Sequence, residues 1–297
     1  VQTRPGYLPS LCLTEVSPPD RFPQVFYRHD AVDTLLAVTA DDLDYVAGAR
    51  MFVTNGTSLC GSPSRESTYR ALERARAAGC RVVLDVDYRA MSWPSPQEAG
   101  LAVRLALPFV DVLIGNQPEL MLVAGEPDLD RATARLRSAG VGMLVSKLGD
   151  QGTRVWSGAD SVFLPPYRVD VCTTIGAGDG FASGFLYGLL QGLPVEECLH
   201  HGNAAASQRS GLHSGTRIIN RLSAACERRV DSQRSAAASR RALPADSGLC
   251  ARCDSTSQRQ TANASGSFKA AAPCAAESAM ASATVVRPSR SETKLNS

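Results

Sequence analysis

Short apolar and β-branched runs alternate with helical patterns between residues 24 and 209, and this alternation constrains the fold more than any other feature. Runs of this length and composition predict buried strands. The predicted strands cover residues 24–27, 51–54, 82–85, 112–114 and 143–146. Strand and helix in alternation predict an α/β fold with a parallel sheet flanked by helices. Right-handed crossovers then bring the C-terminal ends of the strands to one edge, where ligands usually bind.

The helical patterns begin after capping residues or end at glycine, as helices in proteins do. The predicted helices cover residues 62–78, 96–109, 129–138, 179–190 and 194–208. The pattern changes after residue 146, where two short strands over 153–156 and 161–164 flank Gly158-Ala159-Asp160. Such a glycine-containing connection predicts a β-hairpin.

The last part of the chain differs in composition from the rest. Residues 221–297 hold 12 of the 31 Lys and Arg and 6 of the 29 Asp and Glu, which leaves 19 and 23 in the preceding residues. The segment contains only eight Leu, Ile, Val and Phe, too few to offset the entropy of ordering a chain. We therefore expect a folded domain over 1–217 and a disordered basic Ser/Ala/Arg-rich tail over 218–297. Its dispersed charges favour a solvated tail over a nucleic-acid-binding arm.

The nine cysteines are scattered without regular spacing. An odd count of this kind predicts reduced thiols and a cytoplasmic location. Cys250 and Cys253 form a C-x-x-C pair but lack the second Cys or His pair of a zinc site. No run reaches the roughly 18 apolar residues that a membrane span needs, so we expect no membrane partner.

The glycine-rich segment 174–184 is the strongest functional signal. Gly176 and Gly178 let the backbone turn tightly, so that the amides of residues 176–178 point into one concavity. The helix that follows directs its positive dipole end to the same place, which suits a phosphate. Asp179 at the helix start could accept a proton from an attacking hydroxyl. The alternative is an ordinary helix N-terminus that Asp179 caps.

Two further segments follow predicted strands. Lys147-Leu148-Gly149-Asp150-Gln151-Gly152 offers exposed backbone and a charge for a polyphosphate, or is merely a hairpin turn with a surface lysine. Asn116-Gln117-Pro118-Glu119 could share hydrated Mg²⁺ or a phosphate. The alternative for the second segment is a helix capping box between Asn116 and Glu119. Spacing does not separate these alternatives.

Two arginines follow strands at the same predicted edge. Arg89 ends the segment Asp85-Val86-Asp87-Tyr88-Arg89, and Arg28 follows the strand over 24–27. Two guanidinium groups on one rim suit a carboxylate of the substrate. The alternative is a structural ion pair between Asp85 and Arg89. The sequence contains no G-x-x-x-x-G-K-[ST] motif, so a P-loop nucleotide site is excluded.

The order and spacing of these motifs over residues 21–209 resemble the ribokinase-like PfkB carbohydrate kinases. The loop Gly176-Ala177-Gly178-Asp179 is the most specific element of this resemblance. Phe26-Tyr27-Arg28 and the segment from Asp85 to Arg89, followed by Trp93, look most like the kinases that phosphorylate 5-dehydro-2-deoxygluconate in myo-inositol catabolism. Kinases of 2-keto-3-deoxygluconate and other PfkB sugar kinases are the alternative.

The resemblance implies ATP and Mg²⁺ as cofactors and assigns roles to individual residues. Asp179 would be the catalytic base, and Gly176, Ala177 and Gly178 would form the anion hole. Other implied roles are contacts to Mg²⁺ through water for Asn116 and Glu119, to ATP for Lys147, Gly149, Gly152 and Asn203, and to the sugar acid for Tyr27, Arg28 and Arg89. It also allows a homo-oligomer.

The chain departs from the family pattern in two ways. Thr173 stands where the family has Asp or Asn, three residues before the first loop glycine. The first strands and a Gly-Gly substrate motif of the family are not found before residue 21, so the ribokinase-like sheet is expected to be N-terminally incomplete. An inactive nucleotide-binding module therefore remains an alternative to an enzyme.

Overall fold

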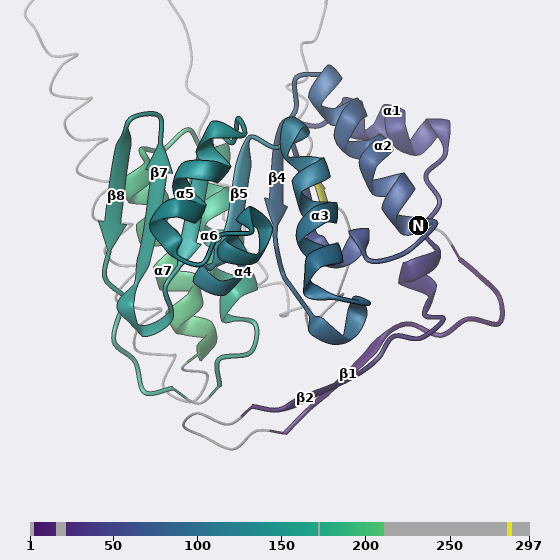
Figure 1. The fold of residues 1–297 in the computed structure, drawn as a ribbon, viewed down its shortest axis with the longest axis horizontal. Helices are drawn as coiled ribbons and strands as arrows, with labels where there is room; N and C mark the ends of the chain where they lie inside the picture. The colour runs from purple at the N-terminus through teal and green to yellow at the C-terminus, as the bar shows by residue number, and fades with distance from the viewer. Residues whose placement is uncertain (1–2, 16–21, 172, 211–283, 287–297) are drawn as a thin grey trace, which may run out of the picture. The chain divides into compact units, whose positions relative to one another are not determined.

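The computed structural model describes residues 3–15, 22–171, 173–210 and 284–286. Its centre is a seven-stranded sheet with the order β8-β7-β6-β5-β4-β3-β9 (Figure 1). The neighbouring strands from β3 to β6 are parallel, whereas β7, β8 and β9 are antiparallel to their neighbours. The strands are β3 (Met51–Asn55), β4 (Arg81–Asp85), β5 (Val112–Asn116), β6 (Met143–Lys147), β7 (Thr153–Ser157), β8 (Asp160–Leu164) and β9 (Thr284–Val286). The sheet is therefore mixed, because the predicted hairpin of β7 and β8 continues it.

The first predicted strand does not belong to this sheet. β2 (Gln24–Tyr27) pairs in antiparallel fashion with β1 (Leu11–Thr14), in a separate two-stranded ribbon (Figure 1). The prediction of a buried strand is wrong here, because Val25 and Tyr27 are more than half exposed. Val25-Phe26-Tyr27 is a continuous apolar run like those of the other four predicted strands, but in the structure the residues of β2 alternate between half-buried and exposed, which is typical of a strand with one solvated face. Those four strands are confirmed.

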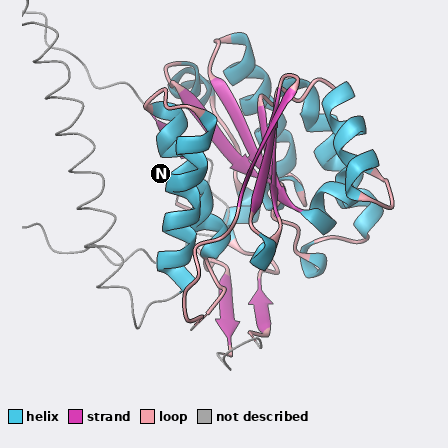
Figure 2. Ribbon diagram, turned by 90° about the vertical axis from the view of Figure 1, so that its left-hand side faces the viewer, coloured by secondary structure: helices cyan, strands magenta, loops and turns pink. Residues whose placement is uncertain are grey.

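Helices cover both faces of the sheet (Figure 2). The helices are α1 (Ala40–Ala47), α2 (Ser64–Ala77), α3 (Pro96–Ala106), α4 (Gln117–Ala124), α5 (Leu129–Ser138), α6 (Ala177–Leu190) and α7 (Val195–Ser210). Alternate strand residues point to opposite faces. Phe52, Leu84 and Leu113 thus pack with α1 to α5, whereas Val83 and Ile114 pack with α6 and α7. The five predicted helices are confirmed; α1 was not predicted, and α4 was expected only in the alternative in which Asn116 caps a helix.

Helices α6 and α7 approach each other closely because small residues line their contact. A β-carbon on Gly184 would lie 2.3 Å from the carbonyl oxygen of His201, and one on Gly188 would lie 2.8 Å from the sulfur of Cys198. Side chains larger than hydrogen at these positions would push the helices apart. This packing fixes the start of α6, which carries the glycine-rich loop.

Apart from β9, the predicted tail over 218–297 lies outside the described residues, as do Cys250 and Cys253. The four cysteines recorded in the described part of the chain are free thiols. Among the helices described, none is long and apolar enough to cross a membrane.

Candidate active site

Three of the predicted segments meet because they end neighbouring parallel strands. Asp85 is the last residue of β4, Asn116 of β5 and Lys147 of β6. Asn116 and Lys147 are direct partners in the register of β5 and β6. The sheet thus brings residues that are up to 62 positions apart in the chain to one edge, as the α/β pattern predicts.

Lys147 is held at this edge by an ion pair with Asp85. Its Nζ lies 3.2 Å from Oδ1 and 3.1 Å from Oδ2 of Asp85. Burial by itself would lower the pKa of Lys147, but the nearby carboxylates of Asp85, Glu119 and Asp87 raise it above its ordinary value. The ammonium group therefore stays charged at neutral pH. Lys147 lies in the site, and Asp85 neutralises much of its charge.

The segment after β4 contains a strained residue. Asp87 has a φ of 37°, in the left-handed region that non-glycine residues rarely adopt. Its Oδ1 lies 2.7 Å from Nη2 of Arg89. Burial raises the pKa of Asp87 to about 6; Arg89 opposes this rise and three carboxylates add to it. These carboxylates belong to Asp85, Glu119 and Asp179.

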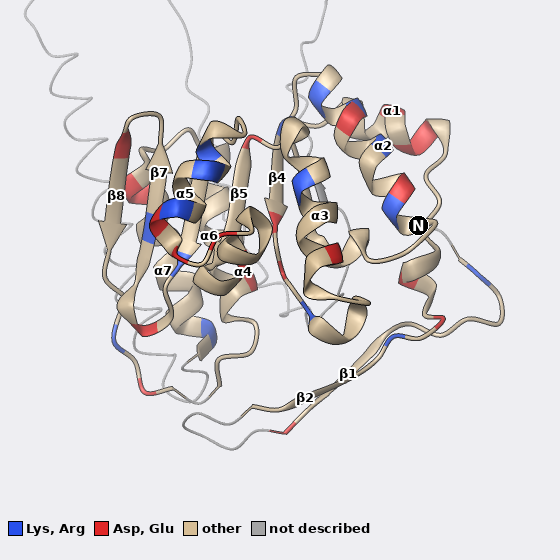
Figure 3. Cartoon of the chain, viewed as in Figure 1, with Lys and Arg blue, Asp and Glu red and all other residues tan. Residues whose placement is uncertain are grey.

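Arg89 does not form the ion pair with Asp85 that was the alternative to a substrate contact, because it pairs with Asp87 and Asp85 pairs with Lys147. In the part of the chain that the structure describes, the buried Nε of Arg89 has no hydrogen-bond partner. Figure 3 shows acidic and basic positions together in the segment that follows β4. One donor of this guanidinium is therefore buried and unsatisfied among the described residues.

Asn116 and Glu119 form the capping box at the start of α4. Oδ1 of Asn116 accepts from the amide of Glu119 at 2.9 Å, and Oε2 of Glu119 accepts from the amide of Asn116 at 2.7 Å. Oε1 of Glu119 also accepts from the amide of Tyr88 at 3.0 Å. Glu119 is 6% exposed, so it joins the end of β5 to the strained segment after β4. A contact to Mg²⁺ through water would be a second role beside this structural one.

The glycine-rich loop begins α6. Gly176 is the N-cap residue with a φ of 77°, and Asp179 is exposed in the first turn. The amide of Ala177 donates to the carbonyl oxygen of Thr174 at 3.2 Å, so it is already engaged within the turn. The amides of Gly178 and Asp179 have no intrahelical acceptor, because they lie in the first turn. Within the described residues, the amides of residues 178 and 179 therefore remain free at this helix start, whereas the amide of Ala177, which was also predicted for the anion hole, is engaged.

This loop lies beside Lys147. A β-carbon on Gly178 would lie 3.5 Å from Nζ of Lys147, and the charge of Asp179 is felt by Asp87. The unusual Thr173 still anchors the loop, because its hydroxyl accepts from the amide of Ile175 at 3.2 Å and its own amide donates to the carbonyl oxygen of Ser210 at 3.2 Å.

The turn between β6 and β7 borders a hollow of about 310 Å³. The hollow is lined by Asn116, Gln117, Pro118, Lys147, Leu148, Gly149 and Gln151. Gly149 and Gly152 have φ values of 62° and 116°, and a β-carbon on Gly152 would lie 2.3 Å from the carbonyl oxygen of Leu164. Both glycines are therefore required by the backbone of this turn.

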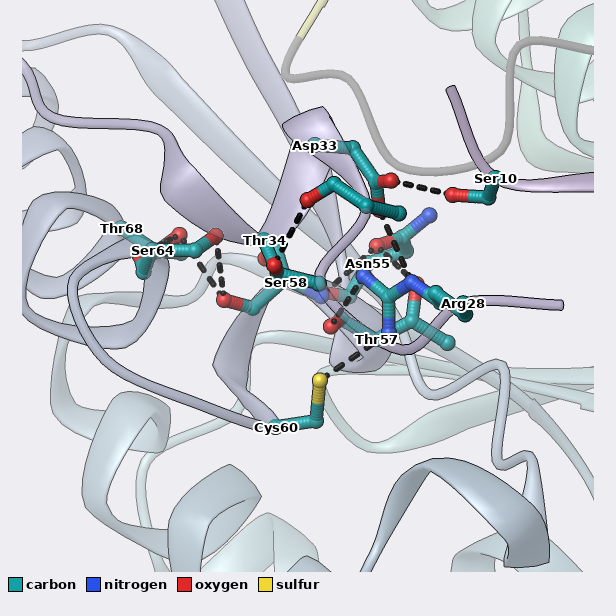
Figure 4. Close-up of polar contacts among 11 residues, drawn as sticks. Ser10, Arg28, Asp33, Thr34, Asn55, Thr57, Ser58, Cys60, Ser64 and Thr68 are labelled. Carbon is teal, nitrogen blue, oxygen red and sulfur yellow. Dashed lines mark hydrogen bonds and ion pairs between the residues drawn. The ribbon is translucent and has the colours of Figure 1, made fainter. Parts of the chain in front are cut away.

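Arg28, which was predicted to contact the sugar acid, is engaged within the protein. Arg28 donates to Oδ2 of Asp33 at 2.8 Å, to the sulfur of Cys60 at 3.0 Å and to the carbonyl oxygen of Thr57 at 3.1 Å (Figure 4). Its side chain is 9% exposed. It shares no hydrogen-bond or ion-pair partner with Arg89 among the described residues. Tyr27, beside it in β2, is 59% exposed.

Asn203 of α7 is 5% exposed. Its Nδ2 donates to the carbonyl oxygen of Pro165 at 3.1 Å, and its Oδ1 accepts from the hydroxyl of Thr153 at 3.1 Å. Both ends of the amide thus connect α7 to β7 and to the segment that leaves β8. A contact with adenine would have to be added to these bonds.

Within the described residues, no group of three or more His, Cys, Asp or Glu side chains is arranged to hold a metal ion directly. Two features of the site were not predicted from the sequence. They are the partly buried ion pair of Lys147 with Asp85 and the shifted pKa of Asp87. The positions of these residues after strands gave a signal for their location but not for their partners.

Comparison with known proteins identifies the family of the chain. The model of the pfkB family carbohydrate kinases matches residues 2–219. The 5-dehydro-2-deoxygluconokinase of Bacillus licheniformis is 32% identical over 217 residues, which are 72% of this chain and 67% of that protein.

Two solved structures are similar in fold. The PfkB protein from Polaromonas sp. JS666 has a TM-score of 0.59 and 25% identity, over 67% of this chain and 65% of that chain. A putative Ribokinase II from E. coli, in complex with ATP and Mg²⁺, has a TM-score of 0.59 and 21% identity, over 70% of each chain. The ribokinase-like fold is therefore confirmed. The chain spans about two thirds of the length of the proteins that it matches.

Proposed function

The chain belongs to the pfkB family of carbohydrate kinases, and we propose that it transfers a phosphoryl group from ATP to a hydroxyl of a sugar acid. The proposed substrate is 5-dehydro-2-deoxygluconate, because the protein of B. licheniformis that bears this activity in its name is 32% identical. The alternative substrates are 2-keto-3-deoxygluconate and related sugars. A cytoplasmic location and a homo-oligomeric state remain predictions.

The observation that carries the proposal is the approach of Lys147 to the start of α6. Nζ of Lys147 would lie 3.5 Å from a β-carbon on Gly178, beside the exposed Asp179. A cation, free amides at a helix start and a carboxylate then surround one point. Phosphoryl transfer requires this combination, because catalysis rests on positioning and on stabilising charge rather than on covalent chemistry.

We assign the role of general base to Asp179. Its carboxylate is exposed at the sheet edge and would accept the proton of the attacking sugar hydroxyl. The amides of Gly178 and Asp179, aided by the dipole of α6, would bind the negative charge of the transferring phosphoryl group. Lys147 would contribute its charge from the end of β6.

The acidic groups of the edge fit a divalent cation held through water. Asn116 and Glu119 retain free lone pairs beside the bonds of their capping box, and Asp85 and Asp87 add negative charge nearby. Magnesium bound here would neutralise charge on the phosphates. Gly149 and Gly152 shape the adjacent hollow for the nucleotide.

We assign the carboxylate of the sugar acid to Arg89, whose buried Nε has no partner among the described residues. An arginine with an unsatisfied donor can accept a further hydrogen-bond partner such as a carboxylate oxygen, although Nη2 of Arg89 already pairs with Asp87. Arg28 is a weaker candidate, since three partners within the protein already occupy it.

The proposal is tested by coupled ADP release from the purified chain with Mg-ATP and a panel of sugar acids and neutral sugars. We expect turnover with 5-dehydro-2-deoxygluconate, and a loss of at least 100-fold in Asp179→Asn because general-base catalysis contributes on this order. Asp160→Asn, an exposed aspartate at the start of β8, is the control. Turnover that survives in Asp179→Asn contradicts the assignment of the base. Stabilisation by ATP without any phosphorylated product would instead favour a non-catalytic nucleotide-binding module.

A further inference from the structure

Arg209 lies against the loop at the start of α6. It belongs to the last turn of α7 and is exposed. A β-carbon on Gly176 would lie 2.8 Å from Nε of Arg209 and 3.5 Å from its Cζ. Gly176 also has a φ of 77°, so glycine is needed here both for the backbone and for the approach of the guanidinium group. The loop is therefore built to accommodate this side chain.

The charge of Arg209 is not balanced by a carboxylate. Within the described residues, the structure records neither an ion pair nor a hydrogen bond for its guanidinium group. The C-terminal carbonyls of α7 favour a cation at this position, whereas the positive N-terminal end of α6 disfavours one. An anion bound between them would be attracted by the guanidinium group and by the helix start together.

Lys147 and Arg209 differ in whether partners within the described protein already engage their charged groups. Lys147 approaches the loop at Gly178, but two oxygens of Asp85 already accept from its ammonium group. Arg209 approaches the same loop at Gly176, and no residue that the structure describes engages its donors. Its planar guanidinium group matches two oxygens of a phosphate, and it keeps its charge at all relevant pH values.

We propose that Arg209 binds the phosphate chain of the nucleotide at the Gly176 end of the loop. This inference rests on the proposed kinase function and adds a residue to its nucleotide site. Arg209 would stabilise negative charge and position the phosphates; it would transfer no proton, because guanidinium groups do not deprotonate in proteins.

The test compares the affinities of the full chain for Mg-ATP, Mg-ADP, adenosine and 5-dehydro-2-deoxygluconate by titration calorimetry. In Arg209→Gln we expect about ten- to hundredfold weaker binding of ATP, the loss typical of a hydrogen bond to a charged group, and unchanged binding of adenosine. Arg209→Lys should restore part of the loss. Arg70→Gln, an exposed arginine of α2 with the same change of charge, should bind ATP as the wild type does.

Three results would overturn the inference. Arg209→Gln that binds ATP as the wild type does shows that the side chain makes no phosphate contact. Equal losses for ATP and adenosine show a structural effect on the loop. A change confined to the affinity for the sugar acid assigns Arg209 to the other substrate. A wild-type chain that binds no nucleotide refutes the proposed function and this inference together, whereas the first three results leave the proposed function intact.

Discussion

Replacing Asp87 by asparagine should stabilise the protein at alkaline pH by more than it does in acid. The native carboxyl has a pKa of about 6 instead of 3.8, chiefly because of burial. A raised native pKa means that the protonated form is favoured on folding. The stability that the protonated carboxyl of Asp87 contributes to the folded protein is fully present below about pH 3.8 and is lost as the pH rises through about 6. Asparagine is neutral at every pH and avoids this loss.

The size of the effect follows from the two pKa values. The ionised carboxylate costs about 3 kcal/mol of folding free energy at pH 8, but only about 1.6 kcal/mol at pH 5. The difference in stability between the variant and the wild type should therefore be about 1.4 kcal/mol larger at pH 8 than at pH 5. The variant also loses the contact with Arg89, which changes its stability by the same amount at pH 5 and at pH 8. The quantity to measure is therefore how much the stability difference between variant and wild type changes from pH 5 to pH 8.

Urea unfolding at several pH values between 5 and 8 measures this difference. Asp160→Asn, an exposed aspartate in β8, is the matched control and should follow the wild type across the whole range. If the gap between Asp87→Asn and the wild type stays constant from pH 5 to 8, the native carboxyl titrates as it does in the unfolded chain. The argument that burial and three neighbouring carboxylates raise its pKa would then be wrong.

Three further predictions concern packing and buried polar groups, each measured by urea unfolding. Gly184→Ala should destabilise the protein by about 1–3 kcal/mol because its β-carbon meets the backbone of α7, whereas Gly61→Ala, with open space around it, should not. Lys147→Met should cost about 1–3 kcal/mol because it leaves the partly buried Asp85 without its partner; the double variant with Asp85→Asn should recover most of this stability but not the affinity for ATP. Glu119→Ala should cost about 1–3 kcal/mol since two backbone amides lose their acceptor, and an unchanged midpoint would contradict the capping box.

The sequence was sufficient for the sheet wherever a strand is buried on both faces. The runs at β3, β4, β5 and β6 are continuous and apolar, and they are too short to form helices. β2 was misassigned to the buried sheet because Val25-Phe26-Tyr27 is as apolar as the buried runs, although Ser17-Pro18-Pro19-Asp20 offers a turn signal between β2 and its partner β1. Helix α1 was missed although Thr39 and Asp42 form a capping box, because its apolar face is short.

The site was predictable in its location but not in its contacts. Parallel strands place their last residues at one edge, so the meeting of Asn116 and Lys147 follows from topology. The ion pair of Lys147 with Asp85 does not follow from topology, because it depends on the register of three strands. Spacing also cannot distinguish a capping box from a ligand site at Asn116 and Glu119, since the same oxygens serve both.

The charges of the edge bear on how a nucleotide could bind there. Four carboxylates and two cations interact with one another through Asp87 or Lys147. The carboxylates belong to Asp85, Asp87, Glu119 and Asp179, and the cations are Arg89 and Lys147. Their excess of negative charge would repel the phosphates of ATP in a partly buried site, where such forces are weakly screened. A divalent cation and a further basic residue reverse this balance, so the same carboxylates that help to raise the pKa of Asp87 favour both Mg²⁺ and Arg209 in the nucleotide site.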